Sequence, residues 1–229
     1  MEGFNTVINF FRDGGVFLYP IAAVFIIGVV IAVERLLYLS KESMGSRGFW
    51  ARVQPLLESG NYTQAISLAN ESSSALAHVM KYGLTRLGAS RRRDDVEKAM
   101  EESLVELIPR LERRTHFLSG LANIGMLMGL LGTIIGLIHA FAAVATANPA
   151  EKASLLAASI SVAMNNTALG LICAITLLLS HMFLETMTTN IIDSLEVASM
   201  KFLNSLTERR LDNEAVKTDV RAGAAGARA

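Results

Sequence analysis

Three long apolar runs without charged side chains dominate the pattern of this chain. Residues 14–33, 117–150 and 153–184 contain no Asp, Glu, Lys or Arg. A helix needs about 20 apolar residues to cross the hydrocarbon core of a bilayer. The pattern therefore predicts three transmembrane helices, at 14–39, 117–145 and 153–184, the first ending just past the charged pair Glu34 and Arg35.

The segments between and around these runs are polar, and their apolar positions recur at helical spacing. In residues 94–114, for example, Val96, Met100, Leu107 and Leu111 share one side of a helix. After Leu211 the composition turns to Ala, Gly and charged residues, which is typical of disorder. We expect an all-α integral membrane protein with a cytoplasmic helical extension. Outside the three spans, the expected segments are an external N-terminal segment (1–13), a cytoplasmic helical region (40–116), an external turn (146–152), a cytoplasmic helix (185–211) and a disordered tail (212–229).

The distribution of basic residues predicts the orientation of the spans. Twelve of the 21 Lys and Arg residues lie between Ser40 and His116, and six follow Glu185. The N-terminal segment has only Arg12, and the turn after the second span has only Lys152. Cytoplasmic loops of membrane proteins carry the excess of Lys and Arg. We therefore expect the N-terminus outside and the C-terminus in the cytoplasm.

Composition supports a membrane protein and excludes several other classes. The chain is 52% hydrophobic, and its mean hydropathy is +0.40. The 21 acidic residues balance the 21 basic ones, so no overall charge favours nucleic acid. The single cysteine, Cys173, excludes an intrachain disulfide framework. No phosphate loop, nucleophile elbow or metal-ligand spacing is present, so the sequence predicts neither an enzyme nor a cofactor.

Small residues line one face of the second and of the third predicted span. Glycines at helical spacing open a face of the second span to close packing, and Thr133 is the one hydroxyl among them. In the third span Ser159, Thr167 and Gly170 belong to a similar stripe, which Asn165 and Asn166 flank. The glycines expected to pack helices are Gly125, Gly129, Gly132, Gly136 and Gly170.

Two interpretations of this polar stripe remain open from the residues alone. Polar groups inside a membrane are costly unless they face protein or a water-filled path. The functional interpretation is an ion pathway between spans two and three, lined by Thr133 and Thr167. Ser159, Asn165 and Asn166 are the further candidates for this pathway. The alternative is plain helix packing, in which the threonine hydroxyls bond to backbone carbonyls of their own helix.

The second and third predicted spans contain no carboxylate. Their only titratable side chains are Cys173, His139 and His181, and His139 lies about 120° around the helix from Thr133. A proton relay through a membrane usually uses a carboxylate or a histidine at mid-depth. If this chain moves protons, we expect the group that carries them to come from a partner protein.

Three segments resemble the ExbB/TolQ/MotA proton-channel family, in its three-span ExbB/TolQ branch. FLYPIAAVFIIGVVIAVERLLYL (17–39) is similar to the first span of that family, and LIPRLERRTHFLSGLANIGMLMGLLGTIIGLIHAF (107–141) is similar to its signature second span. TALGLICAIT (167–176) is similar to its third-span signature. The three segments lie between residues 17 and 176, so the resemblance covers most of the chain.

The resemblance implies an assembly as well as a fold. It implies a ring-shaped homopentamer whose pore holds the single membrane helix of an ExbD/TolR-like partner, with an aspartate on that helix carrying protons. Thr133 and Thr167 match the pore threonines of the family. A TonB/TolA-like protein would pass the resulting movement to the outer membrane, which places the chain in the bacterial inner membrane.

Three positions depart from the family pattern. Val162 stands where a glutamate is usual, Thr176 where a proline follows the Ala-Ile pair, and Met126 where a proline precedes the GLLGT motif. Without the glutamate, Asn165 and Asn166 also suit another cation such as sodium. We expect the channel-forming scaffold subunit of an ion-driven motor, and the alternative is a non-conducting scaffold that only assembles partner proteins.

Overall fold

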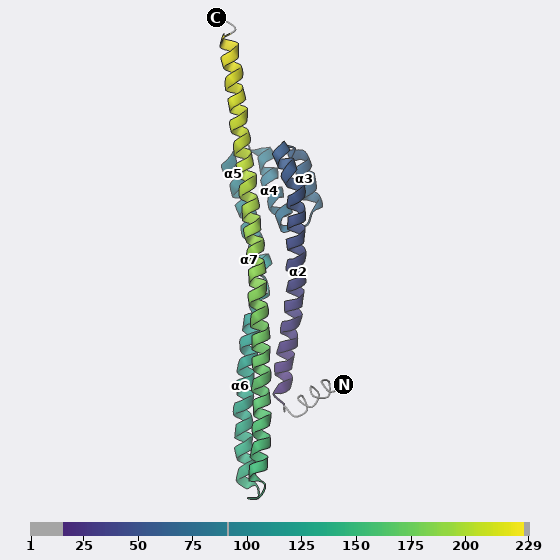
Figure 1. The fold of residues 1–229 in the computed structure, drawn as a ribbon, viewed down its shortest axis with the longest axis vertical. Helices are drawn as coiled ribbons and strands as arrows, with labels where there is room; N and C mark the ends of the chain where they lie inside the picture. The colour runs from purple at the N-terminus through teal and green to yellow at the C-terminus, as the bar shows by residue number, and fades with distance from the viewer. Residues whose placement is uncertain (1–15, 91, 227–229) are drawn as a thin grey trace. The chain divides into compact units, whose positions relative to one another are not determined.

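The computed structural model describes residues 16–90 and 92–226, with side chains as far as residue 207. All regular structure in these residues is helical, which confirms the all-α fold (Figure 1). The N-terminal segment 1–13, the first residues of the predicted first span and the last residues of the tail lie outside the described residues. The helices are α2 (Leu18–Ser59), α3 (Tyr62–Glu71), α4 (Ala75–Ala89), α5 (Arg93–Glu112), α6 (Thr115–Thr146) and α7 (Lys152–Gly226).

The chain divides into two compact units, and the long helices α2 and α7 each contribute to both. The first unit takes the residues up to Leu37 together with Arg113–Thr186. The second takes Tyr38–Glu112 and the chain from Met187 onward. We call them the spanning unit and the extension, and we describe each by itself.

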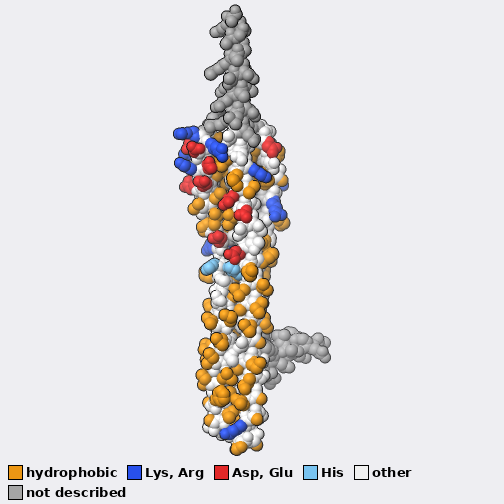
Figure 2. Space-filling model, turned by 60° about the vertical axis from the view of Figure 1, so that its left-hand side comes forward, with side chains coloured by type: hydrophobic (Ala, Val, Ile, Leu, Met, Phe, Trp, Pro, Cys, Tyr) orange, Lys and Arg blue, Asp and Glu red, His pale blue; other side chains and the backbone are white. Residues whose placement is uncertain are grey.

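The spanning unit contains the first part of α2, all of α6 and the first part of α7. Three helical runs, Leu18–Ser59, Arg93–Thr146 and Lys152–Thr207, are long and apolar enough to cross a membrane. Figure 2 shows hydrophobic side chains over most of the visible surface of this unit. Many of the large ones are exposed, among them Ile26, Val30, Leu127, Ile138 and Leu179. A surface of this kind is stable against lipid or against other membrane helices.

The core of the extension consists of large apolar side chains, as in a water-soluble protein. Phe202 of α7 is fully buried together with Met80 and Leu84 of α4, Met100 of α5 and Leu195 of α7. A Cβ on Gly83 would lie 2.6 Å from the Met100 sulfur and 3.2 Å from the Phe202 ring. The glycine therefore lets α4 approach its two neighbours closely.

Short polar caps fix the helix ends of the extension. Asn61 accepts the Gln64 N–H at the start of α3, and Ser74 accepts the Ala77 N–H at the start of α4. Both are preferred N-cap residues, because their side chains satisfy backbone donors that the helix leaves free. Gly60 has a φ of 75°, a left-handed conformation that glycine adopts without strain, and it follows the last residue of α2.

Several predicted boundaries do not coincide with helix ends. The structure continues α2 from the first span to Ser59, and it continues α7 without interruption past residues 184 and 211. No glycine or proline lies between residues 185 and 222, and Ala, Glu, Lys and Arg are good helix formers. The helix through Gly226 differs from the disordered tail expected from residue 212. The positions at which helices leave the membrane stay predictions.

A break that the sequence did not indicate separates α5 from α6. Pro109 lies inside α5, and the helix ends three residues later at Glu112. Arg114 then adopts a left-handed conformation with a φ of 66°, and α6 begins at Thr115. This conformation is uncommon for a residue other than glycine, and it turns the chain into the second span.

Candidate functional site

The candidate site is the contact between α6 and α7, where the two helices lie side by side in the spanning unit (Figure 1). Successive small residues of α6 face successive residues of α7 in reverse order. Gly125 meets Cys173, Gly129 meets Gly170, Gly132 meets Asn166 and Gly136 meets Ala163. The contact is therefore antiparallel, and it holds all five glycines that the sequence predicted to pack helices.

The two backbones approach so closely that a methyl group would not fit between them. A Cβ on Gly170 would lie 2.8 Å from the Gly129 Cα and 2.9 Å from the Gly125 carbonyl oxygen. A Cβ on Gly129 would lie 3.0 Å from the Gly170 Cα. Because backbone atoms cannot turn aside as a side chain can, these two positions accept only glycine. Such small-residue contacts are the usual way for membrane helices to gain packing energy.

Thr133 and Thr167 meet inside this contact. The Thr133 hydroxyl forms a hydrogen bond with the Thr167 hydroxyl. Its oxygen also lies 3.2 Å from the Gly129 carbonyl oxygen and 3.4 Å from that of Ala163. The Thr167 hydroxyl lies 3.3 Å from the same Gly129 carbonyl oxygen. Both side chains are half-buried.

The pair can hold its protons in two arrangements. Each hydroxyl donates one proton and accepts others. One threonine donates to the other, and the second donates to a backbone carbonyl, so rotation of the two hydroxyls reverses the direction of the bond. Such a pair has the donors and acceptors to form hydrogen bonds with a water molecule. It cannot store a proton near neutral pH, because a hydroxyl does not titrate there.

Asn166 is the most deeply buried polar side chain of the contact. It is 3% exposed, and its Cβ and Cγ lie 3.0 and 3.2 Å from the position of a Cβ on Gly132. Within the described part of the chain, no donor reaches its side-chain oxygen. A buried acceptor without a partner costs about 1–3 kcal/mol. An amide with an unused acceptor at this depth is a group that a donor or a cation would stabilise.

The other predicted pathway residues lie apart from the threonine pair. Ser159 and Asn165 are half-buried on α7, and no hydrogen bond between described residues joins either of them to Thr133 or Thr167. His139 is exposed on α6. His181 lies 3.6 Å from the Glu185 carboxylate, one turn further along α7. The structure therefore brings together Thr133, Thr167 and Asn166 of the expected set.

Two contacts of α2 with this pair of helices were missed by the sequence analysis. A Cβ on Gly28 would lie 2.5 Å from a methyl group of Leu177, so Gly28 admits the Leu177 side chain. The Glu34 carboxylate lies 3.0 Å from the Arg114 guanidinium, in an ion pair that joins α2 to the start of α6. The available signals were a glycine inside an apolar span and charged residues of opposite sign at the ends of two spans.

Fold and contact together define a multi-pass, all-helical membrane protein whose second and third spans pack backbone to backbone around a pair of hydroxyls. Among known proteins, the model of the MotA/TolQ/ExbB proton channel family matches residues 71–197, which is more than half of the chain. The chain belongs to this family, and the resemblance seen in its sequence is confirmed.

Individual relatives agree with this assignment. An ExbB homologue of Methanothermobacter thermautotrophicus, named for biopolymer transport, is 31% identical over 196 residues, which cover 85% of this chain and 68% of the relative. An ExbB-like protein of Synechocystis sp., also named for biopolymer transport, is 26% identical over 172 residues, or 74% of this chain and 81% of the relative. The Tol-Pal system protein TolQ of Haemophilus influenzae is 34% identical over 84 residues, or 37% of this chain and 36% of TolQ.

Family membership gives the function in general terms. The chain is a membrane subunit of the proton-channel motor class. The family is one of channels and scaffolds, and its ExbB/TolQ members work with ExbD/TolR-like partners.

Proposed function

We propose that this chain is the channel-forming scaffold subunit of an ion-driven motor in a bacterial inner membrane. Copies of it form a ring, a homopentamer, around the single membrane helix of an ExbD/TolR-like partner. The N-terminus lies outside and the C-terminus in the cytoplasm, as the distribution of basic residues predicts. The motor energises transport or envelope processes at the outer membrane through a TonB/TolA-like transducer.

The observation that carries the proposal is the hydroxyl pair of Thr133 and Thr167 within a contact otherwise made of glycines, apolar groups and the Asn166 amide. Packing alone does not require a hydroxyl here, because the neighbouring positions of the contact are filled by glycines and by Ala163. A hydroxyl pair that can reverse its hydrogen bonds is suited to line a path for water or an ion. Asn166 adds an unused acceptor to the same contact.

The absence of carboxylates from the second and third spans supports a proton-carrying step on the partner. Neither Phe117–Ala150 nor Ala153–Leu184 contains Asp or Glu. Hydroxyls and amides solvate an ion, but they do not bind and release a proton near pH 7. An acidic side chain on the partner helix supplies the missing group, and this chain supplies the polar surface along which it acts.

Protons are the proposed ion, and sodium is the alternative. Val162 replaces the usual glutamate of the family, and the neutral oxygens of Thr133, Thr167 and Asn166 are ligands that also suit sodium. Flux measured with a proton gradient alone and with a sodium gradient alone distinguishes the two ions.

The decisive experiment is the double substitution Thr133→Val and Thr167→Val in a complex reconstituted into liposomes with an ExbD/TolR-like partner. Valine keeps the shape of threonine and removes the hydroxyl. We expect the partner-dependent ion flux to fall at least about tenfold while the ring still assembles. Thr176→Val is the matched control, because Thr176 is an exposed hydroxyl on the same helix.

Liposomes that contain this chain alone supply the second arm of the experiment. We expect little proton or sodium leak until the partner is added. A selective current from this chain alone would contradict the assignment of the carrier to the partner. A complex that assembles with its partner yet shows no flux would favour the non-conducting scaffold.

A further inference from the structure

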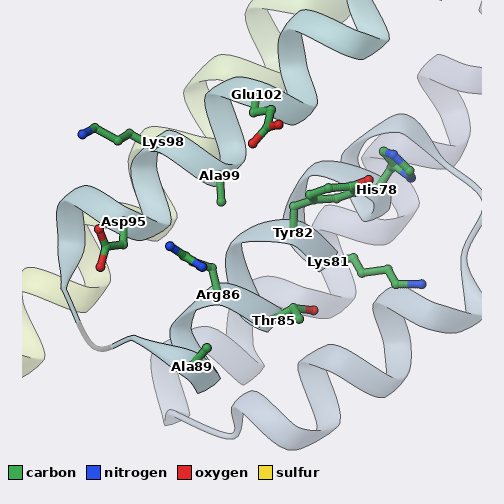
Figure 3. Close-up of a pocket in the computed structure, with 10 residues that line it drawn as sticks. All are labelled: His78, Lys81, Tyr82, Thr85, Arg86, Ala89, Asp95, Lys98, Ala99 and Glu102. Carbon is green, nitrogen blue, oxygen red and sulfur yellow. The ribbon is translucent and has the colours of Figure 1, made fainter.

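The extension contains a pocket whose lining includes none of the candidate ion-pathway residues. It lies along the hairpin of α4 and α5 and has a volume of about 630 Å³ (Figure 3). Pockets of about 300–1,000 Å³ are of the size that holds small molecules. The side chains of Ala89 and Ala99 are small, and they leave room between the two helices.

The pocket has two chemically different ends, because α4 and α5 run in opposite directions. The turn between the helices places Arg86 of α4 near Asp95 and Lys98 of α5. At the other end, His78 and Tyr82 of α4 lie across from Glu102 (Figure 3). One end therefore holds the cations Arg86 and Lys98 beside Asp95, and the other presents aromatic rings beside Glu102 and Lys81.

The cations at the Arg86 end of the pocket are available to an anionic ligand. Within the described residues, neither Arg86 nor Lys98 has an ion-pair partner within 4.0 Å. The Asp95 carboxylate already accepts a hydrogen bond from the Ser90 hydroxyl. That bond, with the nearby charges of Arg86, Arg92 and Lys98, lowers the pKa of Asp95. In Figure 3 the Arg86 guanidinium points into the pocket.

The aromatic end offers a flat surface. Tyr82 is 40% exposed, and its ring centroid lies 5.1 Å from that of His78 at an interplanar angle of 51°. Contact with His78 fixes one side of the tyrosine. The rest of the ring remains available to an aromatic ligand, which prefers such stacked or tilted arrangements.

We propose that this pocket binds a small organic phosphate of the nucleotide class. The phosphate pairs with Arg86. Lys98 extends outward from the pocket in Figure 3, and rotation about its flexible stem would bring its ammonium to the same phosphate. The planar base packs on Tyr82, and a ligand hydroxyl or amino group donates to Glu102. Arginine suits the phosphate because its planar fork makes two parallel hydrogen bonds to phosphate oxygens. The site would give the extension a ligand-binding role that is separate from the ion pathway.

The test uses the full-length protein in detergent and isothermal titration calorimetry with three probes: adenosine diphosphate, inorganic pyrophosphate and adenosine. We expect adenosine diphosphate to bind with a Kd below about 1 mM. We expect Arg86→Gln to weaken that binding at least about tenfold, because the charge-assisted hydrogen bonds to the phosphate are lost. Lys98→Gln should weaken it as well, by a smaller factor.

Two further variants make the test specific. Arg52→Gln removes an exposed arginine of α2 that does not line the pocket, and it should leave the Kd unchanged. Tyr82→Leu should weaken adenosine diphosphate and leave pyrophosphate unchanged, because only the nucleotide has a base. Thermal unfolding of each variant checks that it is folded.

Three outcomes would overturn the proposal. The first is the absence of binding by adenosine diphosphate up to several millimolar. The second is a loss of affinity in Arg52→Gln as large as that in Arg86→Gln. The third is pyrophosphate binding as tightly as the nucleotide with no effect of Tyr82→Leu, which would leave a general phosphate site in place of a nucleotide site.

Discussion

The spanning unit and the extension are both helical, but their helices are held together by different means. At the α6–α7 contact, glycine backbones meet, with a Cβ on Gly170 only 2.8 Å from the Gly129 Cα. In the extension, large side chains fill the space between helices, and Phe202, Met100 and Leu84 are buried almost completely. The same secondary structure thus rests on small residues in one region and on large ones in the other.

The solvent explains this difference. In water, burying a large apolar side chain is favourable in itself, by about 25 cal/mol per Å² of apolar surface. In lipid a leucine gains nothing by leaving the acyl chains for another helix, so association depends on close packing and on hydrogen bonds between helices. Glycines allow the close packing, and the pair Thr133–Thr167 supplies the hydrogen bond. The four predictions below test this difference, from the largest expected effect to the smallest.

The largest effect is expected from Phe202→Ala in the extension. Phe202 is 0% exposed, and replacing a fully buried phenylalanine by alanine costs about 3–5 kcal/mol. Trp50, the only tryptophan, lies in the extension, so its fluorescence during denaturant unfolding measures this loss. Phe183→Ala is the control, because Phe183 is 58% exposed on the spanning part of α7. An equal loss of unfolding free energy in both variants would mean that burial of large side chains does not distinguish the extension from the spanning unit.

The second effect is expected from Gly129→Leu in the spanning unit. The added side chain would meet the backbone of α7, and overpacking of this kind costs about 1–3 kcal/mol or more. Size-exclusion chromatography and thermal unfolding should both report a weakened assembly. Gly120→Leu on the same helix is the matched control, since a Cβ at Gly120 would meet no atom within 4 Å beyond its own stretch of helix. Normal assembly of the Gly129 variant would show that close packing is not required there.

Much of the spanning unit could be predicted from the sequence, because a bilayer restricts the possibilities. A charge-free run of sufficient length permits little besides a helix, and glycines at helical spacing mark the face that packs. Three helical runs are long and apolar enough to span a membrane, and each overlaps one of the three predicted spans. The two threonines were grouped as residues of one path between these spans, and the structure places them in contact.

Other features had no comparable signal. The position of Asn166 opposite Gly132 depends on the register between α6 and α7, and periodicity within one helix does not determine that register. The structure has one continuous helix, α7, where the sequence predicted a span, a cytoplasmic helix and a disordered tail. The prediction was based on changes in composition along the chain, and these do not interrupt the helix. The pocket between α4 and α5 needs residues 78–86 and 95–102 to be aligned, and only the fold supplies this alignment.

The third effect concerns Arg114, where strain and charge oppose each other. Its φ of 66° costs an ordinary residue about 1–2 kcal/mol, whereas glycine adopts this conformation freely. Its ion pair with Glu34 is about half exposed and contributes at most about 1 kcal/mol. We expect Arg114→Gly to be more stable than Arg114→Ala by about 1 kcal/mol, as measured by thermal unfolding. Glu34→Gln isolates the ion pair, and equal stabilities of the Gly and Ala variants would contradict the strain.

The smallest effect concerns the hydrogen bond from Ser90 to Asp95, a polar contact of the extension that water can reach. The bond lowers the pKa of Asp95 from its ordinary value of 3.8, so the carboxylate stabilises the folded state above that pH. The stabilisation is lost as the pH falls through the lowered pKa of the folded state. Ser90→Ala should therefore reduce Tm slightly at pH 7, and its difference from the unmodified protein should shrink as the pH falls below about 3.8.

A double-mutant cycle decides whether this pH dependence belongs to that contact. In a protein that already carries Asp95→Asn, Ser90→Ala should no longer change the pH dependence of Tm, because the titrating group is gone. The Thr133–Thr167 bond of the spanning unit supplies the contrast, since neither hydroxyl titrates in this range and Thr167→Val should lower Tm equally at pH 7 and at pH 3. A loss of Tm in Thr167→Val that depends on pH would mean that a titrating group acts on the hydroxyl pair, and the two regions would then differ less than their packing indicates.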